Sequence, residues 1–522
     1  MTDQSTTPCT DPARGEVFAH SPLTREADVA ELIARSRKAQ SEWAALPLSR
    51  RLAACRRLRD HMLGDADAIA AVISRDNGKT RVDAMSTEVF PALMALTYYM
   101  KKARTFLRPT GLGNGNLLLI NKRSRLLHHP YGVIGVISPW NYPFAIPFSD
   151  VVMGLLAGNG VILKAASETQ AVGRKLEECF LKAGLPEGLF AYVNLPGATA
   201  GKALLQGGVD KLFFTGSVAA GKTLMGLAAE TLTPVVLELG GNDPMLVCAD
   251  ADCERAAAGA VWAGFQNCGQ SCGGVERIYV HRAVYEPFMK ALKRRVEALR
   301  IGLDDDYGCD LGSMTRAAQR DKVEALVQDA LGKGAILFAE SQPQSVPAAG
   351  LFMPARVLAD ASHEMRLMRE EIFGPLVGVM RVENMEQALA LANDSRLALT
   401  ASVWTRSRRH GAALARRLHA GVVMVNDHLM SHGLAETPWG GWKESGIGWT
   451  HGETGFQEMS RSQVIVQDYL PFARRNMWWH PHDRRLYQGL RGALDALYSR
   501  NIGRRVKGLS RLLKIVPRYF KK

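Results

Sequence analysis

The sequence lacks any uninterrupted apolar run of about 18 residues or more, so it predicts no membrane-spanning helix. It also lacks, at its start, a basic segment followed by an apolar run, and we therefore expect no secretory signal. Without export, the eight cysteines are expected to be free thiols and not a disulfide framework. No internal repeat and no low-complexity stretch interrupts the 522 residues, of which 47% are apolar and 22% charged. These absences favour a globular, cytoplasmic protein of two or three domains.

Acidic residues are scarce in the last tenth of the chain. Residues 469–522 contain 14 Lys and Arg but only two Asp, whereas the remainder contains 51 basic and 49 acidic residues. The formal net charge of +14 therefore describes an appended basic segment and not a basic fold. Apolar residues recur in this segment at helical spacing, with basic residues among them. The apolar set comprises Leu486, Leu490, Ala493, Leu494, Leu497, Val506, Leu509, Leu512, Leu513 and Val516.

Two interpretations fit this amphipathic segment. It could be an interfacial helix for an anionic membrane surface, or a helix packed on the body of the protein with a solvated basic face. Because no spanning helix is predicted, only peripheral contact with the inner face of a membrane is expected. No motif that reads nucleic acid accompanies the charge, so we expect no nucleic-acid partner.

The middle of the chain alternates between β-rich apolar runs and helical segments. The apolar runs are Val133–Ile137, Val161–Leu163, Ala191–Val193, Leu212–Phe214 and Val235–Leu237. Helical patterns separate them at about 145–157, 172–184, 199–207 and 217–229. Runs that are apolar on both faces, with helices between them, predict a buried parallel sheet of the α/β class, which binds dinucleotides at the carboxyl ends of its strands. A second alternation from about 241 to 430 predicts a second α/β domain.

The N-terminal part predicts mostly helices. Residues 1 to about 20 are polar and are expected to form a loose arm. Helices are expected at about 49–63, 65–76 and 82–105. Leu117–Ile120 and Ser124–His128 have strand character and are split by two polar residues.

Three residues in distant stretches carry groups suited to acyl chemistry. Cys272, Glu238 and Asn141 each lie near glycine or proline. A cysteine thiolate can attack a carbonyl, a carboxylate can activate water, and a side-chain amide can donate a hydrogen bond to the oxyanion. Cys268 lies four residues before Cys272, where a helical turn would put both on one face, so it is either a resolving thiol or an inert neighbour. The other six cysteines are expected to be small buried hydrophobes.

In this order the three stretches resemble the motifs of the NAD(P)-dependent aldehyde dehydrogenase family. They read Pro139-Trp140-Asn141-Tyr142-Pro143, Leu237-Glu238-Leu239-Gly240-Gly241 and Phe265-Gln266-Asn267-Cys268-Gly269-Gln270-Ser271-Cys272-Gly273-Gly274. The resemblance covers roughly residues 20–468 and implies that Cys272 is the nucleophile, Glu238 the general base and Asn141 the oxyanion donor. The separation of 34 positions between Glu238 and Cys272 is the one that the family motif expects.

The resemblance also implies the domain organisation. It predicts a Rossmann-type dinucleotide-binding domain, an α/β catalytic domain and a projecting hairpin that pairs subunits as a homodimer or homotetramer. An exposed hairpin left unpaired would be a sheet-edge liability, which agrees with an oligomer. The implied boundaries are 1–111 and 131–237 for the dinucleotide-binding domain, 238–450 for the catalytic domain, 112–130 and 451–468 for the oligomerisation segments, and 469–522 for the basic extension.

The usual dinucleotide fingerprint is absent, because no G-x-G-x-x-G follows a predicted strand. Instead, Phe214-Thr215-Gly216-Ser217 ends a strand before a helix, where free backbone N–H groups can hold a phosphate. In the family, this phosphate motif is joined by a lysine at the adenosine ribose and a glutamate at the nicotinamide ribose. The cofactor residues implied for this chain are Lys164, Ser167, Gly216, Ser217, Gly221, Trp140, Gly240, Glu371 and Phe373.

Ser167 bears on the choice between NAD and NADP. The family commonly reads Lys-Pro-x-Glu at this point, whereas the chain reads Lys164-Ala165-Ala166-Ser167. A glutamate would repel a 2′-phosphate and a serine can accommodate it, so we expect NADP to be accepted, alone or beside NAD. Glu168 could supply the carboxylate instead by a shift of one residue.

The resemblance implies that an aldehyde is oxidised to the carboxylic acid through a thioester on cysteine, without a metal. The presence of Glu238 favours hydrolysis of that thioester over transfer to coenzyme A. The basic extension resembles that of fatty aldehyde dehydrogenases, where a terminal helix covers the substrate funnel, so we expect a medium- or long-chain aliphatic or otherwise apolar aldehyde. The alternative is a semialdehyde dehydrogenase with a small polar substrate, the extension serving only membrane or partner binding.

Overall fold

The structure is a computed structural model that describes residues 5–520, the side chain of Leu117 excepted. The described chain forms two compact units. One comprises residues up to 107 together with 128–461, and the other comprises 108–127 together with the residues from 462 onward.

The first unit contains a six-stranded sheet in the order β19-β9-β8-β5-β6-β7. Its strands are β5 (Val133–Ile137), β6 (Gly160–Lys164), β7 (Phe190–Val193), β8 (Lys211–Thr215), β9 (Val235–Glu238) and β19 (Gly446–Ile447). The helices between them are α6 (Ala145–Ala157), α7 (Gln170–Lys182), α8 (Gly197–Gly207) and α9 (Val218–Thr231). The pairings among β5–β9 are parallel, and only β19 runs antiparallel to its neighbour β9. The predicted parallel sheet with crossover helices is confirmed.

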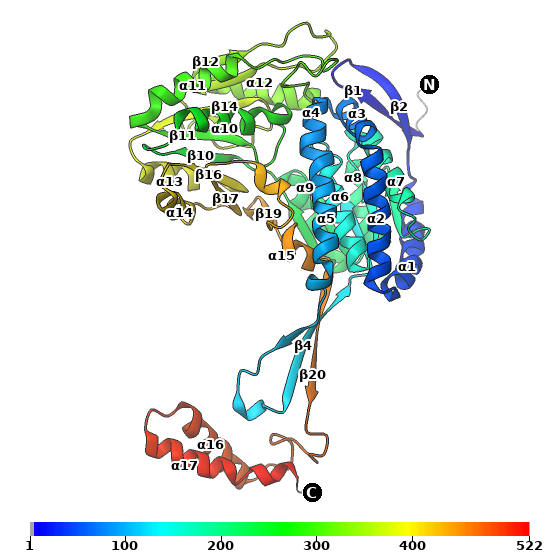
Figure 1. Cartoon of the computed structure of the whole chain (residues 1–522), viewed down its shortest axis with the longest axis vertical. Helices are drawn as coiled ribbons and strands as arrows, with labels where there is room; N and C mark the ends of the chain where they lie inside the picture. The colour runs from blue at the N-terminus through cyan, green and yellow to red at the C-terminus, as the bar shows by residue number, and fades with distance from the viewer. Residues whose placement is uncertain (1–4, 521–522) are drawn as a thin grey trace. The chain divides into compact units, whose positions relative to one another are not determined.

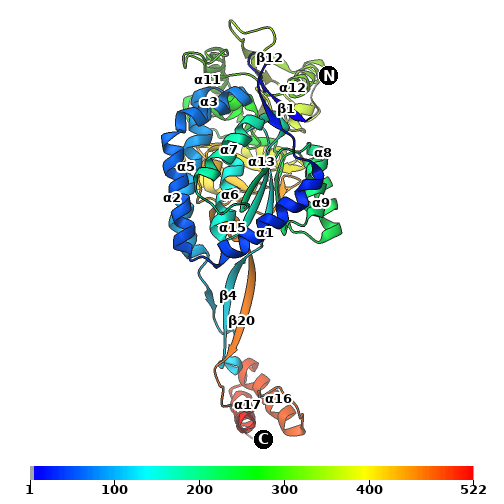
Figure 2. The same ribbon diagram turned by 90° about the vertical axis from the view of Figure 1, so that its right-hand side faces the viewer.

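Successive residues of the central strand explain why helices cover both faces of this sheet (Figures 1 and 2). Ile134 and Val136 pack in one hydrophobic cluster with α6 and α7, whereas Val133 and Ile137 pack in another with α8 and α9. Every residue of β5 is buried, as expected for a strand that is covered on both sides.

A seven-stranded sheet in the order β12-β13-β14-β11-β10-β16-β17 confirms the second α/β alternation. Its strands are β10 (Asp243–Val247), β11 (Val275–His281), β12 (Ile336–Ser341), β13 (Ala355–Ala359), β14 (Leu376–Val382), β16 (Thr400–Trp404) and β17 (Val422–Val425). The associated helices are α10 (Cys253–Phe265), α11 (Tyr285–Glu297), α12 (Ala317–Gly332), α13 (Met385–Asn393) and α14 (Arg408–Ala415). All its pairings are parallel apart from that of β12 with β13.

The prediction of a loose N-terminal arm is wrong. Residues 6–22 form an antiparallel hairpin of β1 (Thr6–Asp11) and β2 (Glu16–Pro22). The side-chain amide of Asn194 donates hydrogen bonds to the Thr7 hydroxyl and to the Ser21 carbonyl. The hairpin therefore depends on a residue far along the chain, which its own polar sequence does not reveal.

Helices follow the hairpin, close to the predicted positions. They are α1 (Val29–Ala45), α2 (Leu48–Gly64), α3 (Ala66–Asn77), α4 (Arg81–Ala84) and α5 (Phe90–Phe106). The helix expected over 82–105 is not continuous, because a π-helical turn, η2 (Met85–Val89), joins α4 to α5. Such turns are frequent at functional sites, and this one carries the buried Glu88.

A three-stranded sheet in the order β20-β4-β3 contributes strands to the second unit. Its strands are β3 (Thr110–Leu112), β4 (Lys122–Pro130) and β20 (Ser460–Asp468). The strand expected at Leu117–Ile120 is wrong, since Leu117–Leu119 form a short 3-10 helix, η3. Asn116 explains the difference: its side-chain oxygen accepts a hydrogen bond from the backbone N–H of Leu118, and its carbonyl accepts one from Leu119.

The C-terminal extension is helical, as its periodicity predicts. It contains α16 (Arg484–Tyr498), α17 (Ile502–Leu513) and a 3-10 turn, η9 (Val516–Tyr519). The two helices pack closely on each other at Gly492 and Gly508, since a Cβ on Gly508 would lie 2.5 Å from the carbonyl oxygen of Gly492. Among residues 5–520, no helix combines the length and the apolar character needed to cross a membrane.

Candidate active site

Cys272 lies in the loop between α10 and β11, after a strained turn. In that turn, η5 (Gln266–Gly269), Asn267 and Cys268 both have a φ of 53°, in the left-handed region. Because these residues interrupt the helix, the two cysteines do not share a helical face. The buried Cys268 thiol donates to the carbonyl of Gly312 at 3.1 Å, which favours the inert neighbour over the resolving thiol.

Cys272 lines an apolar cavity of about 210 Å³. No Lys, Arg, Asp or Glu is among the residues that line it. Some of its apolar side chains are exposed at the surface, among them Phe90 at 60% and Met430 at 45%. Burial lowers the pKa of His432, which also lines the cavity, to about 4, so this ring is neutral near pH 7. The cavity therefore suits an apolar molecule better than an anion.

A second, smaller cavity of about 10 Å³ also reaches Cys272. Besides Cys272, its polar lining consists of Asp150, Thr215, Glu238, His432, Trp439, Thr450 and His451. A cavity of this volume holds about one water molecule, provided that two or more polar groups surround it. The cysteine thus stands between an apolar space and a polar one of the size of a single water.

Glu238 ends β9 inside this small cavity. Among the described residues, neither of its carboxylate oxygens has a hydrogen-bond partner of ordinary geometry, although both are buried. Burial, and then the negative charge of Asp150, raise the pKa of Glu238 well above its usual range, and the nearby Trp439 indole offsets only part of the shift. Buried polar groups are nearly always paired, so an unpartnered buried carboxyl group is a candidate for a functional role.

Asp150, on α6, is the second carboxyl group of the small cavity. Burial raises its pKa to about 7, although the Thr450 hydroxyl donates to Asp150 Oδ1 at 3.1 Å and lowers it in part. Sequence reasoning missed this residue. A signal was present, because Asp150 is an acidic residue in a helix whose other residues, Ser149 apart, are apolar or glycine.

The Cys272 thiol is neutral in this environment. Burial raises its pKa most, and the negative charges of Glu371, Asp243 and Glu238 raise it further. The loop that follows Glu238 packs directly on the cysteine, since a Cβ on Gly241 would collide with the Cys272 carbonyl oxygen. The thiol therefore needs a positive charge beside it before it becomes a strong nucleophile.

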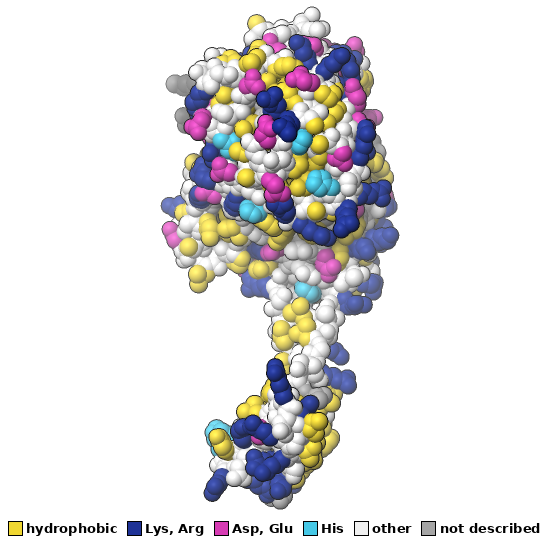
Figure 3. Space-filling model, turned by 90° about the vertical axis from the view of Figure 1, so that its left-hand side faces the viewer, with side chains coloured by type: hydrophobic (Ala, Val, Ile, Leu, Met, Phe, Trp, Pro, Cys, Tyr) yellow, Lys and Arg dark blue, Asp and Glu magenta, His cyan; other side chains and the backbone are white. Residues whose placement is uncertain are grey.

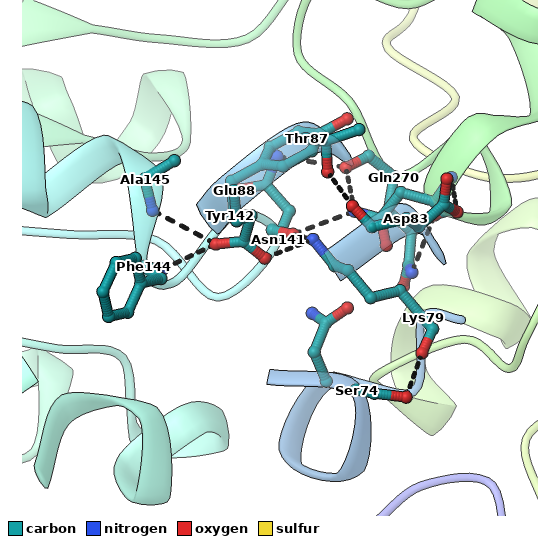
Figure 4. A network of polar contacts seen from close by, with 12 residues as sticks. Ser74, Lys79, Asp83, Thr87, Glu88, Asn141, Tyr142, Phe144, Ala145 and Gln270 are labelled. Atoms are coloured by element: carbon teal, nitrogen blue, oxygen red, sulfur yellow. Dashed lines mark hydrogen bonds and ion pairs between the residues drawn. The ribbon is translucent and has the colours of Figure 1, made fainter. Parts of the chain in front are cut away.

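Asn141 is held next to the cysteine segment by the network in Figure 4. Its side-chain Nδ2 donates to the carbonyl of Gln270 at 3.0 Å, two residues before Cys272. Its own backbone carbonyl accepts from Lys79 Nζ at 2.8 Å and from Asn267 Nδ2 at 2.9 Å. One side-chain N–H is used by Gln270, and an amide nitrogen carries a second.

A buried ion pair contacts this network through Lys79. Sequence reasoning missed it. Lys79 Nζ and Glu88 Oε1 lie 2.6 Å apart, and neither side chain is exposed. The other oxygen of Glu88 accepts from the backbone N–H groups of Phe144 and Ala145, at the start of α6. No sequence motif joins these two residues, because the π-helical turn decides which way Glu88 points.

The predicted phosphate motif lies at the carboxyl end of β8. The Ser217 hydroxyl accepts from the N–H of Ala220 and caps α9. A Cβ on Gly221 would lie 2.6 Å from Leu239, so this glycine lets α9 approach the sheet closely. Lys164 ends β6 and is buried; burial lowers its pKa, and the charge of Glu168 opposes the shift. These features fit the phosphates and the ribose of a dinucleotide.

The remaining predicted cofactor residues are Gly240, Glu371, Trp140 and Phe373. The carboxylate of Glu371 accepts from the N–H of Gly241 at 3.0 Å, and a Cβ on Gly240 would lie 2.7 Å from it. The rings of Trp140 and Phe373 meet edge to face with centroids 5.3 Å apart. The negative charge of Glu371 raises the pKa of the Cys272 thiol, so the Glu371 carboxylate lies near this sulfur.

Comparison with known proteins decides the family. The sequence matches the Aldehyde dehydrogenase family over residues 1–465. This chain is an aldehyde dehydrogenase. Enzymes of the family oxidise aldehydes with NAD(P)⁺, and this is the cofactor of the chain. Members of the family are typically oligomeric.

Similar proteins carry different substrate names. The chain is 37% identical over 489 residues to a 4,4'-diapolycopene aldehyde oxidase of Methylomonas sp, covering 93% of this chain and 90% of that protein. It is 37% identical over 455 residues to a protein of Mycolicibacterium smegmatis named "Putative succinate-semialdehyde dehydrogenase [NADP(+)]", covering 87% of each. The crystal structure of an aldehyde dehydrogenase from Brucella melitensis biovar abortus 2308 matches with a TM-score of 0.85 and 31% identity, covering 90% of this chain and 95% of that one.

One group of side chains in the described part of the aldehyde dehydrogenase has the spacing of a metal site. It consists of His61, Asp65 and Glu178. Lys175 Nζ lies 2.5 Å from the Asp65 carboxylate and 2.9 Å from that of Glu178, so a cationic side chain already occupies the space between the acids. This group is an ion-pair cluster at the surface.

Proposed function

We propose that the enzyme oxidises a medium- or long-chain aliphatic or otherwise apolar aldehyde to the carboxylic acid, through a thiohemiacetal and then a thioester on Cys272. One observation carries this proposal. The Cys272 thiol lines both the apolar cavity and the small polar cavity that contains Glu238. A substrate in the first cavity and a water in the second would reach the sulfur from different sides.

Residues of the chain supply most steps of the proposed mechanism. The Cys272 thiol releases its proton to solvent, Sγ bonds to the aldehyde carbon, and the Asn141 amide and the Cys272 backbone N–H donate to the oxyanion. When bound, NAD(P)⁺ would supply the positive charge that favours the thiolate and would take up the hydride. Loss of the hydride from carbon leaves the thioester. Glu238 then takes a proton from water, the oxygen bonds to the thioester carbon, and the C–S bond breaks with its electron pair on sulfur.

The lining of the large cavity supports an apolar substrate. Succinate semialdehyde carries a carboxylate, whose burial without a cationic partner is costly. The cavity contains no Lys or Arg, and His432 is uncharged there. The name of the Methylomonas relative agrees with this choice and that of the Mycolicibacterium relative does not.

The test is a substrate series assayed with the full-length enzyme. We expect kcat/KM to rise with chain length from short to long aliphatic aldehydes and to exceed that for succinate semialdehyde by about tenfold or more. The reverse order would favour the semialdehyde. Cys272→Ala should abolish turnover for every aldehyde in the series, and retained activity in that variant would refute the assignment of the nucleophile.

We also propose that NADP⁺ is accepted alongside NAD⁺. Ser167 stands where the family commonly has a glutamate, and Glu168 is engaged with Arg316, its carboxylate 3.1 Å from the guanidinium. With serine at position 167 and Glu168 paired with Arg316, no carboxylate at position 167 would repel a 2′-phosphate. Comparison of kcat/KM for the two cofactors, with Ser167→Glu as the control that should restore NAD⁺ preference, tests the idea; strict NAD⁺ use by the wild type would overturn it.

The domain roles follow from these residues. We propose that 1–111 and 131–237 bind the cofactor and that 238–450 carry Cys272. The strands within 112–130 and 451–468 would pair subunits as a homodimer or homotetramer, which light scattering of the intact enzyme can measure.

Residues 469–522 are proposed to contact an anionic membrane peripherally. One stripe of α17 carries large apolar side chains at the surface, with Ile502 at 77% and Val506 at 65% exposure, beside many cations. Deleting 470–522 should abolish binding to anionic vesicles. A changed chain-length profile with unchanged vesicle binding would instead support a lid over the substrate funnel.

A further inference from the structure

The C-terminal extension contains a cavity of about 140 Å³ between the start of α16 and the end of α17. The residues that line it are Arg475, Asp483, Arg485, Leu486, Lys514, Ile515, Pro517 and Arg518. Half of them are cationic and one is acidic, which is an uncommon lining for a cavity formed within one small helical unit.

The guanidinium groups are fixed by the backbone. Arg518 is only 8% exposed and donates to the carbonyls of Met477, Trp479 and Pro481. Its own carbonyl accepts from Arg475 Nε at 3.0 Å. Arg485 Nη2 donates to the carbonyl of Lys514 at 2.9 Å. These bonds orient the side chains before any ligand arrives and leave other N–H groups of Arg475 and Arg485 for one.

The single acid of the lining is already engaged. Asp483 caps α16 by accepting from the N–H of Leu486 at 2.6 Å, and its other oxygen lies 3.8 Å from Arg518 Nη1. Among the described residues, no acidic partner lies within ion-pair distance of Arg475, Arg485 or Lys514. Three positive charges around the cavity are therefore unpaired, and an anion would satisfy them.

An apolar surface borders the same cavity. The exposed stripe of α17 continues through Leu513, which directly precedes Lys514, to Val516, which directly precedes Pro517. Trp479 and Phe520 are also about half exposed, at 56% and 49%. Figure 3 shows hydrophobic and basic side chains gathered on the surface of these helices. A ligand that joins an anionic group to an apolar body would use both features.

We propose that this cavity binds the phosphate group of an anionic phospholipid, with the exposed stripe of α17 lying among the neighbouring acyl chains. Arginine N–H groups match the geometry of phosphate oxygens, and exposed aromatic residues are favoured at the membrane interface. The inference rests on the membrane contact proposed above and gives that contact a specific headgroup site.

Matched charge changes in the full-length enzyme test the site. Lys514→Gln, and the stronger double change Arg485→Gln with Lys514→Gln, remove cations from the cavity. Lys507→Gln, and Arg484→Gln with Lys507→Gln, remove equal charge from exposed positions outside it. Lys514 and Lys507 are both exposed, and neither side chain makes a hydrogen bond or ion pair within the described chain, so the single changes leave the helices intact.

Sedimentation with phosphatidylglycerol–phosphatidylcholine vesicles provides the measurement. The cavity double variant should bind about tenfold or more weakly relative to its control, because it loses fixed contacts besides charge. Equal losses in the two double variants would show diffuse attraction only and overturn the site. If the wild type fails to bind these vesicles, the membrane contact falls as well. If the wild type binds and the variants do not differ from one another, the proposed headgroup site in the cavity is wrong, while the membrane contact stands.

Inorganic phosphate distinguishes the source of the anion. Calorimetry with phosphate at constant ionic strength should show weak binding, and phosphate should displace the enzyme from vesicles poorly. Tight phosphate binding that Lys514→Gln abolishes, together with unchanged vesicle binding, would identify a site for free phosphate and contradict the lipid assignment.

Discussion

Two buried glutamates in the same unit have opposite surroundings. The carboxylate of Glu88 is fully buried and accepts hydrogen bonds from Lys79, Phe144 and Ala145. Glu238 is 6% exposed, and neither of its oxygens has a partner of ordinary geometry in the described chain. A buried charge whose bonds are satisfied holds structure together, whereas one left unsatisfied is available to a substrate or a water.

The surroundings of Glu88 and those of Glu238 therefore have different roles. The Glu88 region fixes the backbone of Asn141 and the start of α6. The Glu238 region is a cavity of the size of one water beside the Cys272 thiol. Changes in the first region should mainly affect folding, and changes in the second should mainly affect chemistry.

The largest effect is expected from Lys79→Ala. This change leaves Glu88 buried without its cation, which should lower the free energy of unfolding by about 3–5 kcal/mol. Denaturant-induced unfolding measures it. The exposed pair of Lys222 and Glu444, 2.9 Å apart, provides the control, since Lys222→Ala should cost under about 1 kcal/mol. Similar costs for both variants would contradict the contrast between satisfied and surface ion pairs.

Asn141→Ala separates the two effects. The backbone carbonyl of Asn141 accepts from Lys79, and its side chain lies beside the cysteine segment. Removing its amide should lower kcat/KM about 10²–10³-fold through loss of an oxyanion donor. Its backbone carbonyl, which Lys79 and Asn267 hold, remains in place, so stability should fall far less than in Lys79→Ala. A decrease of less than tenfold in kcat/KM, measured at saturating cofactor, would argue against the proposed oxyanion role.

Asp150→Asn should shift a pH profile. The negative charge of Asp150 raises the pKa of Glu238, so its removal lowers that pKa and lets the base ionise at lower pH. The rising limb of thioester hydrolysis should therefore move to lower pH. The other titratable groups that face this cavity or Asp150 are Cys272, His432, His451 and Tyr99.

These other groups do not produce the same shift. Burial lowers the pKa of His432 to about 4 and that of His451 well below its usual value, so both rings are neutral near pH 7, and burial raises the pKa of Tyr99. Cys272 acts before the thioester forms, so hydrolysis measured after the first turnover excludes it. A profile that stays fixed in Asp150→Asn, or one that moves to higher pH, would contradict the proposed coupling.

The sequence correctly predicts those helices and strands that are determined by local residue patterns. Val133–Ile137 was recognisable as a buried strand because it is apolar on both faces, and Ser217 as a cap because it follows a strand and precedes a helix. The N-terminal hairpin was missed because it depends on Asn194. The pairing of Lys79 with Glu88 depends on a π-helical turn that no propensity predicts.

The same division holds within the site. Cys272 and Glu238 were predicted as site residues from their order and spacing, and in the structure both line one cavity. Asp150 was not found, since its importance arises from burial beside Glu238 in one cavity, and no sequence interval reveals that proximity.

The central claim is that Glu238 activates the water that releases the acid and is not needed for hydride transfer. Rapid mixing of Glu238→Gln with NAD(P)⁺ and an apolar aldehyde tests it most directly. We predict a burst of about one NAD(P)H per active site, followed by steady-state turnover reduced about 10²–10⁴-fold. Loss of the burst together with turnover, or a steady-state rate equal to that of the wild type, would contradict the account.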